Sequence, residues 1–231
     1  MRIPTIMAHS GCEDTQPNTL AYLQAGLLSG ADILEVDTQL TGDGVAIAWH
    51  DEKIHGCWIR ETPYRALKER APELLTLNEA LAFLDNAPVG VNLDYKSTGL
   101  SAQHILKLAT REEGHALSVS GVWREDALRL RREGLDGHAQ LWMSPESEEG
   151  EAVRAQWAQT LRSAKEAGCE RVNVRHDFLN AQMVQAAHAQ GMRVQVWTVD
   201  RLEDMERALQ LGVDGITTNR VRDLRGLLEK R

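Results

Sequence analysis

The stretch ILEVDTQLTGDGVAIAWH, residues 33–50, decides the fold of this protein. It contains two β-rich runs, Ile33–Asp37 and Val45–His50, with Thr-Gly-Asp-Gly between them at 41–44. Asp-Gly flanked by β-rich runs is a strong hairpin signal. No helical run separates these two strands, although helical runs separate most of the other strands. The hairpin is therefore the exception in a chain that otherwise alternates strand and helix.

Outward from the hairpin, β-rich and amphipathic helical runs alternate along the whole sequence. The other expected strands are Thr5–His9, Val89–Tyr95, Leu117–Ser120, Ala139–Met143, Arg171–Val174, Arg193–Thr198 and Gly215–Thr218. The expected helices are Leu20–Leu28, Ala102–Thr110, Ala127–Arg132, Ala152–Ala167, Ala181–Ala189 and Met205–Leu211. Such alternation implies parallel strands joined by helical crossovers. We predict an α/β protein with one domain over residues 1–231, a TIM-type (β/α)8 barrel whose second strand forms the hairpin.

Composition narrows the possible partners and the compartment. The chain has 26 basic and 34 acidic residues and a net charge of −8, which argues against a nucleic-acid partner. Cys12, Cys57 and Cys169 show no paired spacing for zinc, so we expect free thiols in a reducing, cytoplasmic compartment. A strand-like run follows Met1 almost at once, so we expect no signal peptide. No apolar run approaches the roughly 20 residues that span a bilayer, so no stable membrane insertion is expected. No pattern indicates an oligomeric state.

The hairpin is expected to bring a histidine to a carboxylate. A two-residue turn at 43–44 pairs Asp37 with His50, and one at 42–43 pairs Glu35 with His50. The two carboxylates share one face of the strand because side chains alternate with period two. Directly opposite residues lie about 5 Å apart, so either register predicts His50 beside a carboxylate. The alternative, three exposed hairpin residues, is disfavoured because both carboxylates lie in an otherwise apolar strand.

Reactive groups of a β/α barrel lie at the C-terminal ends of its strands. Three carboxylates, those of Glu35, Asp37 and Asp94, are expected at these strand ends. Carboxylates are hard oxygen ligands that suit one Mg²⁺ or Ca²⁺ ion, with Mn²⁺ as a further candidate. Two imidazoles can share proton transfer, one as base and one as acid, and a lysine can bind a phosphate oxygen as a point charge. The side chains expected at these strand ends are His9, Glu35, Asp37, His50, Asp94, Lys96 and Trp197.

Seven short motifs carry a family resemblance over nearly the whole chain. In order they are AHSG at 8–11, NTL at 18–20, LEVD at 34–37 with TGDGV at 41–45, HD at 50–51, LDYK at 93–96, VWTVD at 196–200 and LGVDGITTN at 211–219. They are similar to A-H-R-G, P-E-N-T-L, E-x-D…T-x-D-G-x-x-V, H-D, E-I-K, V-W-T-V-N and L-G-V-D-G-I-x-T-D of the glycerophosphodiester phosphodiesterase family, whose members have a phospholipase C-like phosphodiesterase barrel. Each motif alone is unspecific, but seven in order at barrel positions are a strong signal.

The resemblance implies an enzyme, a metal-dependent phosphoric diester hydrolase. Its substrate would be a small-molecule glycerophosphodiester, cleaved to an alcohol and glycerol phosphate in lipid and glycerol metabolism. The implied catalytic pair is His9 and His50. The implied metal ligands are Glu35, Asp37 and Asp94, and the expected substrate contacts are Lys96, Trp197 and Ser10.

Some positions depart from the family pattern. Ser10 stands where the family has arginine, which implies loss of a bidentate phosphate donor that Arg60 or Arg175 would have to replace. Pro17 stands where the family has glutamate, and Asp94 is one methylene shorter than the usual glutamate. The segment 51–75 is a short or trimmed form of the insertion that caps the substrate in the family. Two alternatives therefore stand: a degenerate barrel that binds a phosphorylated ligand without turnover, and an enzyme that forms or cyclises phosphodiesters on the same site.

Overall fold

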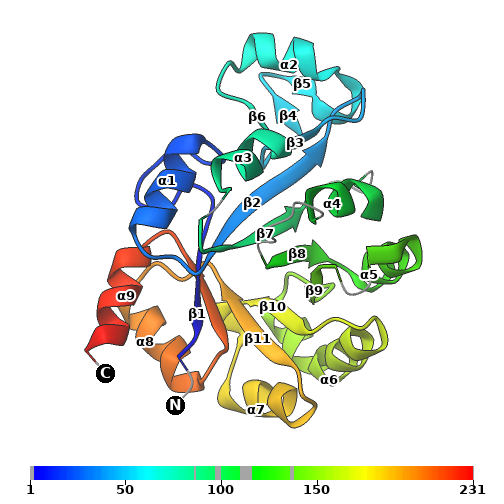
Figure 1. Ribbon diagram of the computed structural model, residues 1–231. Helices are drawn as coiled ribbons and strands as arrows, with labels where there is room; N and C mark the ends of the chain where they lie inside the picture. Colours follow the sequence, from blue (N-terminus) through cyan, green and yellow to red (C-terminus); the bar gives the residue numbers. More distant parts are fainter. Residues whose placement is uncertain (1–2, 86, 97–99, 110–115, 136–137, 231) are drawn as a thin grey trace.

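Eight parallel strands close into a barrel in the computed structural model, which describes residues 3–85, 87–96, 100–109, 116–135 and 138–230 (Figure 1). The ring closes because β1 pairs with both β12 and β2, and each remaining strand pairs with its neighbours in chain order. The predicted TIM-type barrel is confirmed. Its strands are β1 (Thr5–Ala8), β2 (Ile33–Leu40), β7 (Gly90–Tyr95), β8 (Leu117–Val122), β9 (Gln140–Met143), β10 (Arg171–Arg175), β11 (Arg193–Trp197) and β12 (Gly215–Thr218).

The helices lie around the outside of this ring (Figure 1). Two of them, α1 (Leu20–Leu28) and α7 (Ala181–Ala189), have the predicted bounds. The other predicted helices are α4 (Ala102–Ala109), α5 (Arg124–Leu130), α6 (Gly150–Glu166) and α8 (Leu202–Leu211). Thr110, the predicted end of α4, lies outside the described residues. Helices that the sequence did not predict are α2 (Tyr64–Arg70), α3 (Leu77–Phe83) and α9 (Val221–Glu229), and the short helices are η1 (Ile59–Glu61), η2 (Arg131–Leu135) and η3 (His176–Phe178).

The predicted hairpin is present, but both predicted registers are wrong. Strand β3 (Ala46–Ala48) pairs antiparallel with β2, with Thr38 opposite Ala48. The turn is a three-residue loop, 42–44, because the Thr41 N–H donates to the Val45 carbonyl at 3.0 Å. Gly44 closes it with φ +79°, the left-handed residue that such loops require. The loop has three residues where two were predicted, so the pairing differs by one residue from each predicted register. As a result Trp49, and not His50, lies opposite Asp37, and its N–H donates to the Asp37 carbonyl at 3.1 Å.

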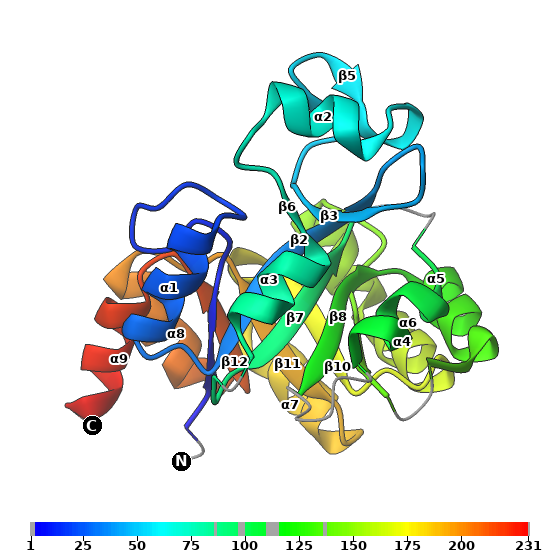
Figure 2. The ribbon, with the colours of Figure 1, turned by 45° about the horizontal axis from the view of Figure 1, so that its top comes forward.

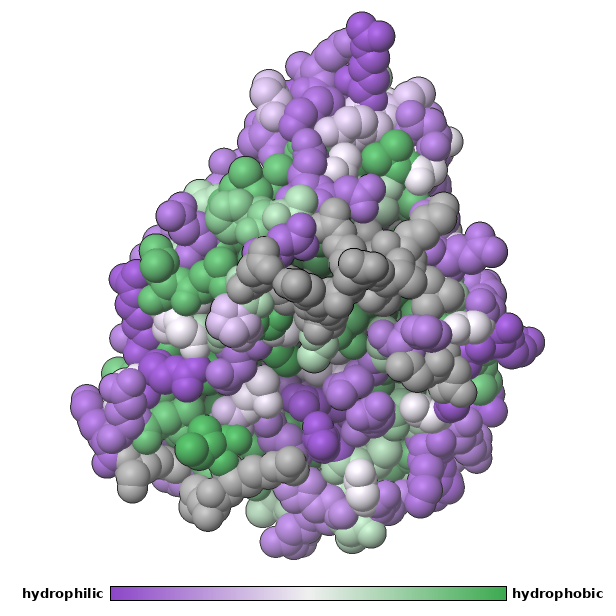
Figure 3. Space-filling model, in the orientation of Figure 1, coloured by the Kyte–Doolittle hydropathy of each residue, from purple (hydrophilic) through white to green (hydrophobic). Residues whose placement is uncertain are grey.

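A short insertion follows the hairpin and stands above the barrel (Figure 2). It consists of β4 (Lys53–Ile54), β5 (Cys57–Trp58), η1, α2 and β6 (Leu75–Thr76), and β6 returns the chain to the sheet by pairing with β3. Its outer tip is hydrophilic (Figure 3). A small separate apolar core holds it together, formed by Ile47, Ile54, Ile59, Leu67, Ala71 and Leu74. The insertion therefore has its own packing above the end of β2.

The barrel interior contains buried polar side chains in hydrogen-bonded pairs. The Arg171 guanidinium donates to Gln195 Oε1 at 2.6 Å, and Gln195 Nε2 donates to Thr217 Oγ1 at 2.9 Å. A Cβ on Gly215 would come within 1.9 Å of Gln195 Oε1, so this strand position has room only for glycine. Pairing of this kind removes the cost of burying polar groups. Among the described residues, no helix is both long and apolar enough to cross a bilayer.

Candidate active site

Three carboxylates converge where β2 and β7 lie side by side. These strands are parallel and in register, with Asp37 opposite Asp94. Glu35 lies two residues before Asp37 and shares its face, as the period of a strand requires. One oxygen from each of Glu35, Asp37 and Asp94 lies within 4.8 Å of the others. The predicted cluster is therefore assembled by strand register.

Glu35 is buried beneath the open end of the barrel, with 4% of its surface exposed. Burial raises the pKa of its carboxyl well above the usual range, and the neighbouring charges of Asp37 and Asp94 raise it further. One backbone donor opposes them, because the Ser10 N–H lies 2.8 Å from Glu35 Oε2. Without a cation, this carboxyl therefore favours its protonated form.

Asp37 is surrounded by donors. Burial acts to raise the pKa of its carboxyl, but the Lys96 ammonium and hydrogen bonds from Asn18 and Ser10 bring that pKa below the usual value. Asn18 Nδ2 and the Ser10 hydroxyl both donate to Oδ2, at 2.7 and 2.8 Å. Asn18 Oδ1 accepts from the Asp37 N–H in return, at 3.1 Å. The Ser10 side chain, predicted as a phosphate contact, thus faces a carboxylate, and its contact with phosphate stays a prediction.

Lys96 follows β7 and points back at the carboxylates. Its Nζ lies 2.5 Å from Asp94 Oδ2 and 3.2 Å from Asp37 Oδ1. Desolvation would lower the pKa of the lysine, but the charges of Asp94 and Asp37 raise it above the usual value. The ammonium therefore stays charged and is about one quarter exposed, so it can also meet a phosphate oxygen from the open side.

The donor set fits one hard divalent cation. Asp37 Oδ1 is buried and makes no hydrogen bond within the described part of the chain, although the Lys96 ammonium lies near it. An oxygen left in this state is costly unless a cation neutralises it. Three ionised carboxylates and one ammonium leave two net negative charges, the charge that Mg²⁺, Ca²⁺ or Mn²⁺ balances. Oxygen donors are also the ligands that these ions prefer.

Two residues that sequence reasoning missed support Asp94. The Ser120 hydroxyl lies 3.0 Å from Asp94 Oδ1. Next to it, Gly121 has φ +72°, and a Cβ there would come within 2.7 Å of the same oxygen. A lone glycine near the end of a strand is a weak sequence signal, and only the packing of β7 against β8 shows why no side chain fits at this position.

His50 lies beyond the paired part of the hairpin, on a bend. The buried Gln39 holds this bend, because its Nε2 lies 3.1, 3.1 and 2.5 Å from the carbonyl oxygens of Trp49, His50 and Asp51. His50 Nδ1 lies 2.8 Å from Asp51 Oδ1, and the imidazole is 61% exposed. The charge of His50 is the last of the causes that lower the pKa of Asp37, after the Lys96 ammonium and the hydrogen bonds from Asn18 and Ser10. The hairpin register does not pair His50 with either carboxylate, so its approach to the cluster stays a prediction.

His9 follows β1 and is tied to the far end of the chain. Its Nδ1 lies 3.0 Å from Asn219 Oδ1, a contact that spans 210 residues. Both predicted catalytic histidines therefore hold Nδ1 against an acceptor oxygen, which leaves Nε2 of each ring for other partners.

The remaining predicted contacts lie at the rim. Trp197 ends β11 and is 38% exposed. Beside His50, the insertion forms an open hollow of about 530 Å³ with Trp58, whose ring carries the Lys53 ammonium 4.1 Å from its centroid. Arg60 and Arg175, the possible replacements for the missing arginine, already contact acids: Arg60 lies 3.4 Å from Glu61, and Arg175 lies 2.6 Å from Asp177.

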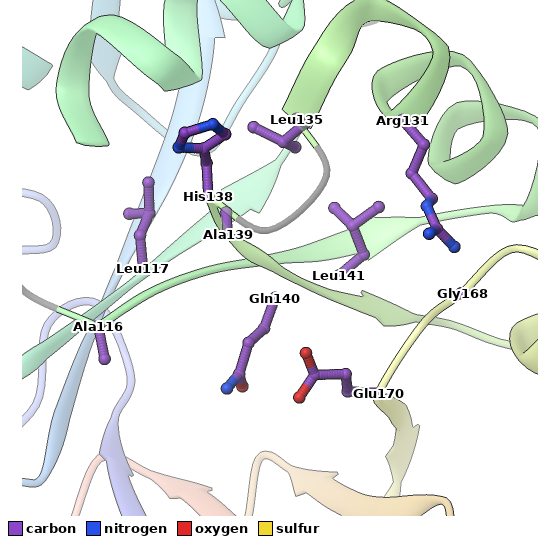
Figure 4. A pocket seen from close by; sticks show the side chains of 10 residues that line it. All are labelled: Ala116, Leu117, Arg131, Leu135, His138, Ala139, Gln140, Leu141, Gly168 and Glu170. Carbon is purple, nitrogen blue, oxygen red and sulfur yellow. The ribbon is translucent and has the colours of Figure 1, made fainter. Parts of the chain in front are cut away.

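Another hollow lies at the opposite, N-terminal end of the strands. It measures about 330 Å³ and lies between the starts of β8 and β9 and helix η2 (Figure 4). Its polar lining includes His138, Gln140 and Glu170, together with Arg131, which donates to the Ala167 carbonyl at 3.2 Å. Catalytic groups of this fold lie at the other end. We therefore assign the chemistry to the carboxylate cluster.

Comparison with known proteins agrees with the geometry. Residues 9–223 match the sequence model of the glycerophosphoryl diester phosphodiesterase family. The chain is 25% identical to glycerophosphodiester phosphodiesterase GDPD4 of Arabidopsis thaliana, over 98% of this chain and 74% of the relative. It is 24% identical to a glycerophosphodiester phosphodiesterase of Caldanaerobacter subterraneus subsp. tengcongensis, over 97% and 98% of the two chains.

Solved structures share the fold at low identity. A phosphodiesterase of Oleispira antarctica, solved with the product sn-glycerol-3-phosphate, superposes with a TM-score of 0.82 at 18% identity, over 98% of this chain and 97% of that one. A protein of Silicibacter pomeroyi described as a glycerophosphoryl diester phosphodiesterase gives 0.82 at 20% identity, over 99% and 94%. The family match covers most of the chain, and the predicted resemblance and enzyme class are confirmed: this protein belongs to the glycerophosphoryl diester phosphodiesterase family.

Proposed function

We propose that this protein hydrolyses a glycerophosphodiester to an alcohol and glycerol phosphate at the carboxylate cluster, with His9 and His50 as the proton-transfer pair. One observation carries the proposal: three carboxylates converge at the barrel end where both histidines are found, and the buried Asp37 Oδ1 accepts no hydrogen bond from the described residues, although the Lys96 ammonium lies 3.2 Å away. A site of this charge binds a cation, and two histidines at its rim supply an acid and a base.

Each side chain has a defined task in this proposal. Glu35, Asp37 and Asp94 would hold the divalent ion, which when bound supplies positive charge to stabilise the negative charge that develops on the phosphate. One histidine takes a proton from the attacking oxygen, which belongs either to water or to a hydroxyl of the substrate, and the other gives a proton to the departing alcohol oxygen. If the substrate hydroxyl attacks, water then opens the cyclic ester to give glycerol phosphate. Lys96 holds a phosphate oxygen from the open side of the cluster.

The substrate is a small molecule bound between the barrel rim and the insertion. Trp197 provides an apolar wall for the alcohol part, while the hollow beside Trp58 is lined mainly by the polar side chains of His50, Asp51, Glu52 and Lys53. Ser10 is retained as a phosphate contact through the free lone pairs of its hydroxyl oxygen. Residues 1–231 act as one catalytic domain, because the insertion and the barrel both contribute to this site.

We place the reaction in lipid and glycerol metabolism, in the cytoplasm. The three cysteines are free, which suits a reducing compartment. Cys12 and Cys169 are buried, and desolvation raises the pKa of each thiol to about 12, which disfavours the reactive thiolate at neutral pH.

Phosphorus NMR of glycerophosphocholine and glycerophosphoethanolamine incubated with the purified protein tests the function. We expect the diester signal to be replaced by that of glycerol phosphate, with activity lost in excess EDTA and restored by Mg²⁺, Mn²⁺ or Ca²⁺. A cyclic ester or a new diester would indicate a cyclising or phosphodiester-forming enzyme. No turnover of either substrate with any of the three ions would favour a barrel that only binds. Full activity after dialysis against EDTA would contradict the metal assignment.

A further inference from the structure

The Asn219 side chain lies between His9 and Asp200. His9 Nδ1 lies 3.0 Å from Asn219 Oδ1, and Asn219 Nδ2 lies 2.8 Å from Asp200 Oδ2. The three residues follow β1, β12 and β11, which are neighbours in the ring. The ends of parallel neighbours meet at one rim, so this row of side chains is a product of barrel closure.

The acid in this row determines which way the amide faces. Asp200 accepts three hydrogen bonds, from the Asn219 N–H at 2.8 Å, from Asn219 Nδ2 at 2.8 Å and from the Thr218 hydroxyl at 3.2 Å. An ionised carboxylate can only accept, so the NH₂ end of the amide must point toward Asp200. The carbonyl end is then left for His9, and a carbonyl can only accept from the ring.

We propose that Asn219 and Asp200 are positioning residues that keep the proton of neutral His9 on Nδ1, so that Nε2 is the nitrogen that exchanges protons with substrate. This rests on the proposed function, since it takes His9 as catalytic. An amide alone could turn and offer its NH₂ group to Nδ1, which would move the ring proton to Nε2. Asp200 prevents this turn. A serine protease whose triad aspartate is replaced by asparagine loses about 10⁴ in kcat through the wrong tautomer, which shows how much such control can matter.

The sequence supports treating the pair as a unit. Asp200 and Asn219 stand where the related motifs V-W-T-V-N and T-D have asparagine and aspartate. The two residue types are exchanged between the two positions, so the pair still contains one carboxylate and one amide. In this chain the neutral amide is the direct partner of the ring.

Nitrogen NMR measures the tautomer without reference to activity. Long-range proton–nitrogen spectra of ¹⁵N-histidine-labelled protein, recorded in EDTA at a pH where the rings are neutral, distinguish protonated from unprotonated ring nitrogens. The His9→Gln spectrum identifies the His9 signals among those of the eight histidines. We expect the proton of His9 on Nδ1, the form that free histidine in water favours less. A proton on Nε2 in the wild type would overturn the proposal.

Asp200→Asn removes the constraint with little change in shape. We expect the His9 signals to shift toward the Nε2-protonated form and kcat on glycerophosphocholine to fall on the order of 10–10³-fold, below the full loss from an inverted tautomer, with little change in KM. Asp223→Asn is the matched control. Asp223, like Asp200, carries a negative charge that raises the pKa of the Arg220 guanidinium, but Asp223 is not part of the row. This control should leave both the tautomer and kcat unchanged.

Reversing the pair provides the rescue. Asn219→Asp alone sets two carboxylates against each other and should lower kcat. Combined with Asp200→Asn, the introduced carboxylate can accept from His9 Nδ1 and from the introduced amide, so the double variant should recover the Nδ1-protonated form and most of the lost turnover. Asp200→Asn that behaves like the control, or a double variant no better than both single ones, would overturn the proposal. A wild-type protein without turnover would refute the proposed function, while the NMR pattern would still decide the tautomer.

Discussion

Ser10→Ala tests whether the carboxylate cluster depends on donors behind it. The change removes one hydroxyl donor, 2.8 Å from Asp37 Oδ2, and leaves the second donor, Asn18 Nδ2, in place at 2.7 Å. The Ser10 N–H to Glu35 also survives, because it is a backbone group. The perturbation therefore acts on the orientation and charge of a single carboxylate.

The expected size follows from these contacts. A hydrogen bond to a charged group contributes roughly 1.5–3 kcal/mol. Loss of a partner that orients a metal ligand typically weakens metal binding about 10–100-fold, or about 1.4–2.8 kcal/mol. Because Asn18 still donates to the same oxygen, we expect the lower part of that range, about 10–30-fold.

Isothermal titration calorimetry with Mn²⁺ and Mg²⁺ measures this change. Ser10→Thr keeps the hydroxyl and should retain most of the affinity. Ser29→Ala is the matched control, since it removes a buried hydroxyl that donates to the Ala25 carbonyl, far from the acids. Metal affinity of Ser10→Ala within twofold of the wild type, under conditions where Asp37→Asn abolishes binding, would refute the idea that this hydroxyl orients the ligand.

Three further predictions concern Glu35, Gly121 and His50. In EDTA at pH 8, Glu35→Gln should melt higher than the wild type, because the raised Glu35 pKa means that the folded state keeps a proton that the unfolded chain releases. The contribution of Glu35 to wild-type stability therefore falls as pH rises above about 4.3, by at most about 1.4 kcal/mol for each pH unit, until the carboxyl of the folded protein ionises. Equal melting temperatures at pH 8 would contradict this. Gly121→Ala should lower the free energy of unfolding by about 1–3 kcal/mol, measured by chemical denaturation, and should also weaken Mn²⁺ binding. Gly44→Ala is the control: its backbone also has a positive φ, but no atom lies within 4 Å of the added methyl group, so it should lower stability alone. His50→Ala should lower kcat on the order of 10²–10⁴-fold with an unchanged melting temperature, because the ring is exposed; a loss under tenfold would reject its role.

Local pattern was enough to predict the barrel and the cluster of three carboxylates. Alternating strands and helices leave few topologies open, and period two in β2 places Glu35 and Asp37 on one face without any knowledge of the rest. Asp-Gly at 43–44 predicted the hairpin, and strand ends predicted where His9 and Asp94 would lie. These features depend on residues that are close together in the sequence, so they can be predicted from the sequence alone.

The sequence did not predict helices α2, α3 and α9 or the small core of the insertion. Of these helices, α2 and α3 are only seven residues long. The apolar residues of the insertion form a core only when β3, η1 and α2 meet, as Ile47, Ile59 and Leu67 do. Short helices show too few turns for a periodic signal, and tertiary contacts supply most of their stability.

The hairpin register was decided by the turn as a whole. A three-residue loop needs a left-handed residue at its end, and both 42 and 44 are glycines, so sequence left the loop length open. One extra residue moved His50 out of the pair, and its position came instead from Gln39, which holds the bend at residues 49–51.

Sequence by itself determined the fold, the family and the residue types of the site; tertiary structure decided what each side chain touches. Ser10 reads as a substrate contact in sequence, yet it meets Asp37 because β1 lies beside β2. Asn219 meets His9 across 210 residues because the barrel closes between β12 and β1. Periodicity is a local property that the sequence displays, whereas closure and register are collective results of packing that bring together residues with no sequence relation to one another.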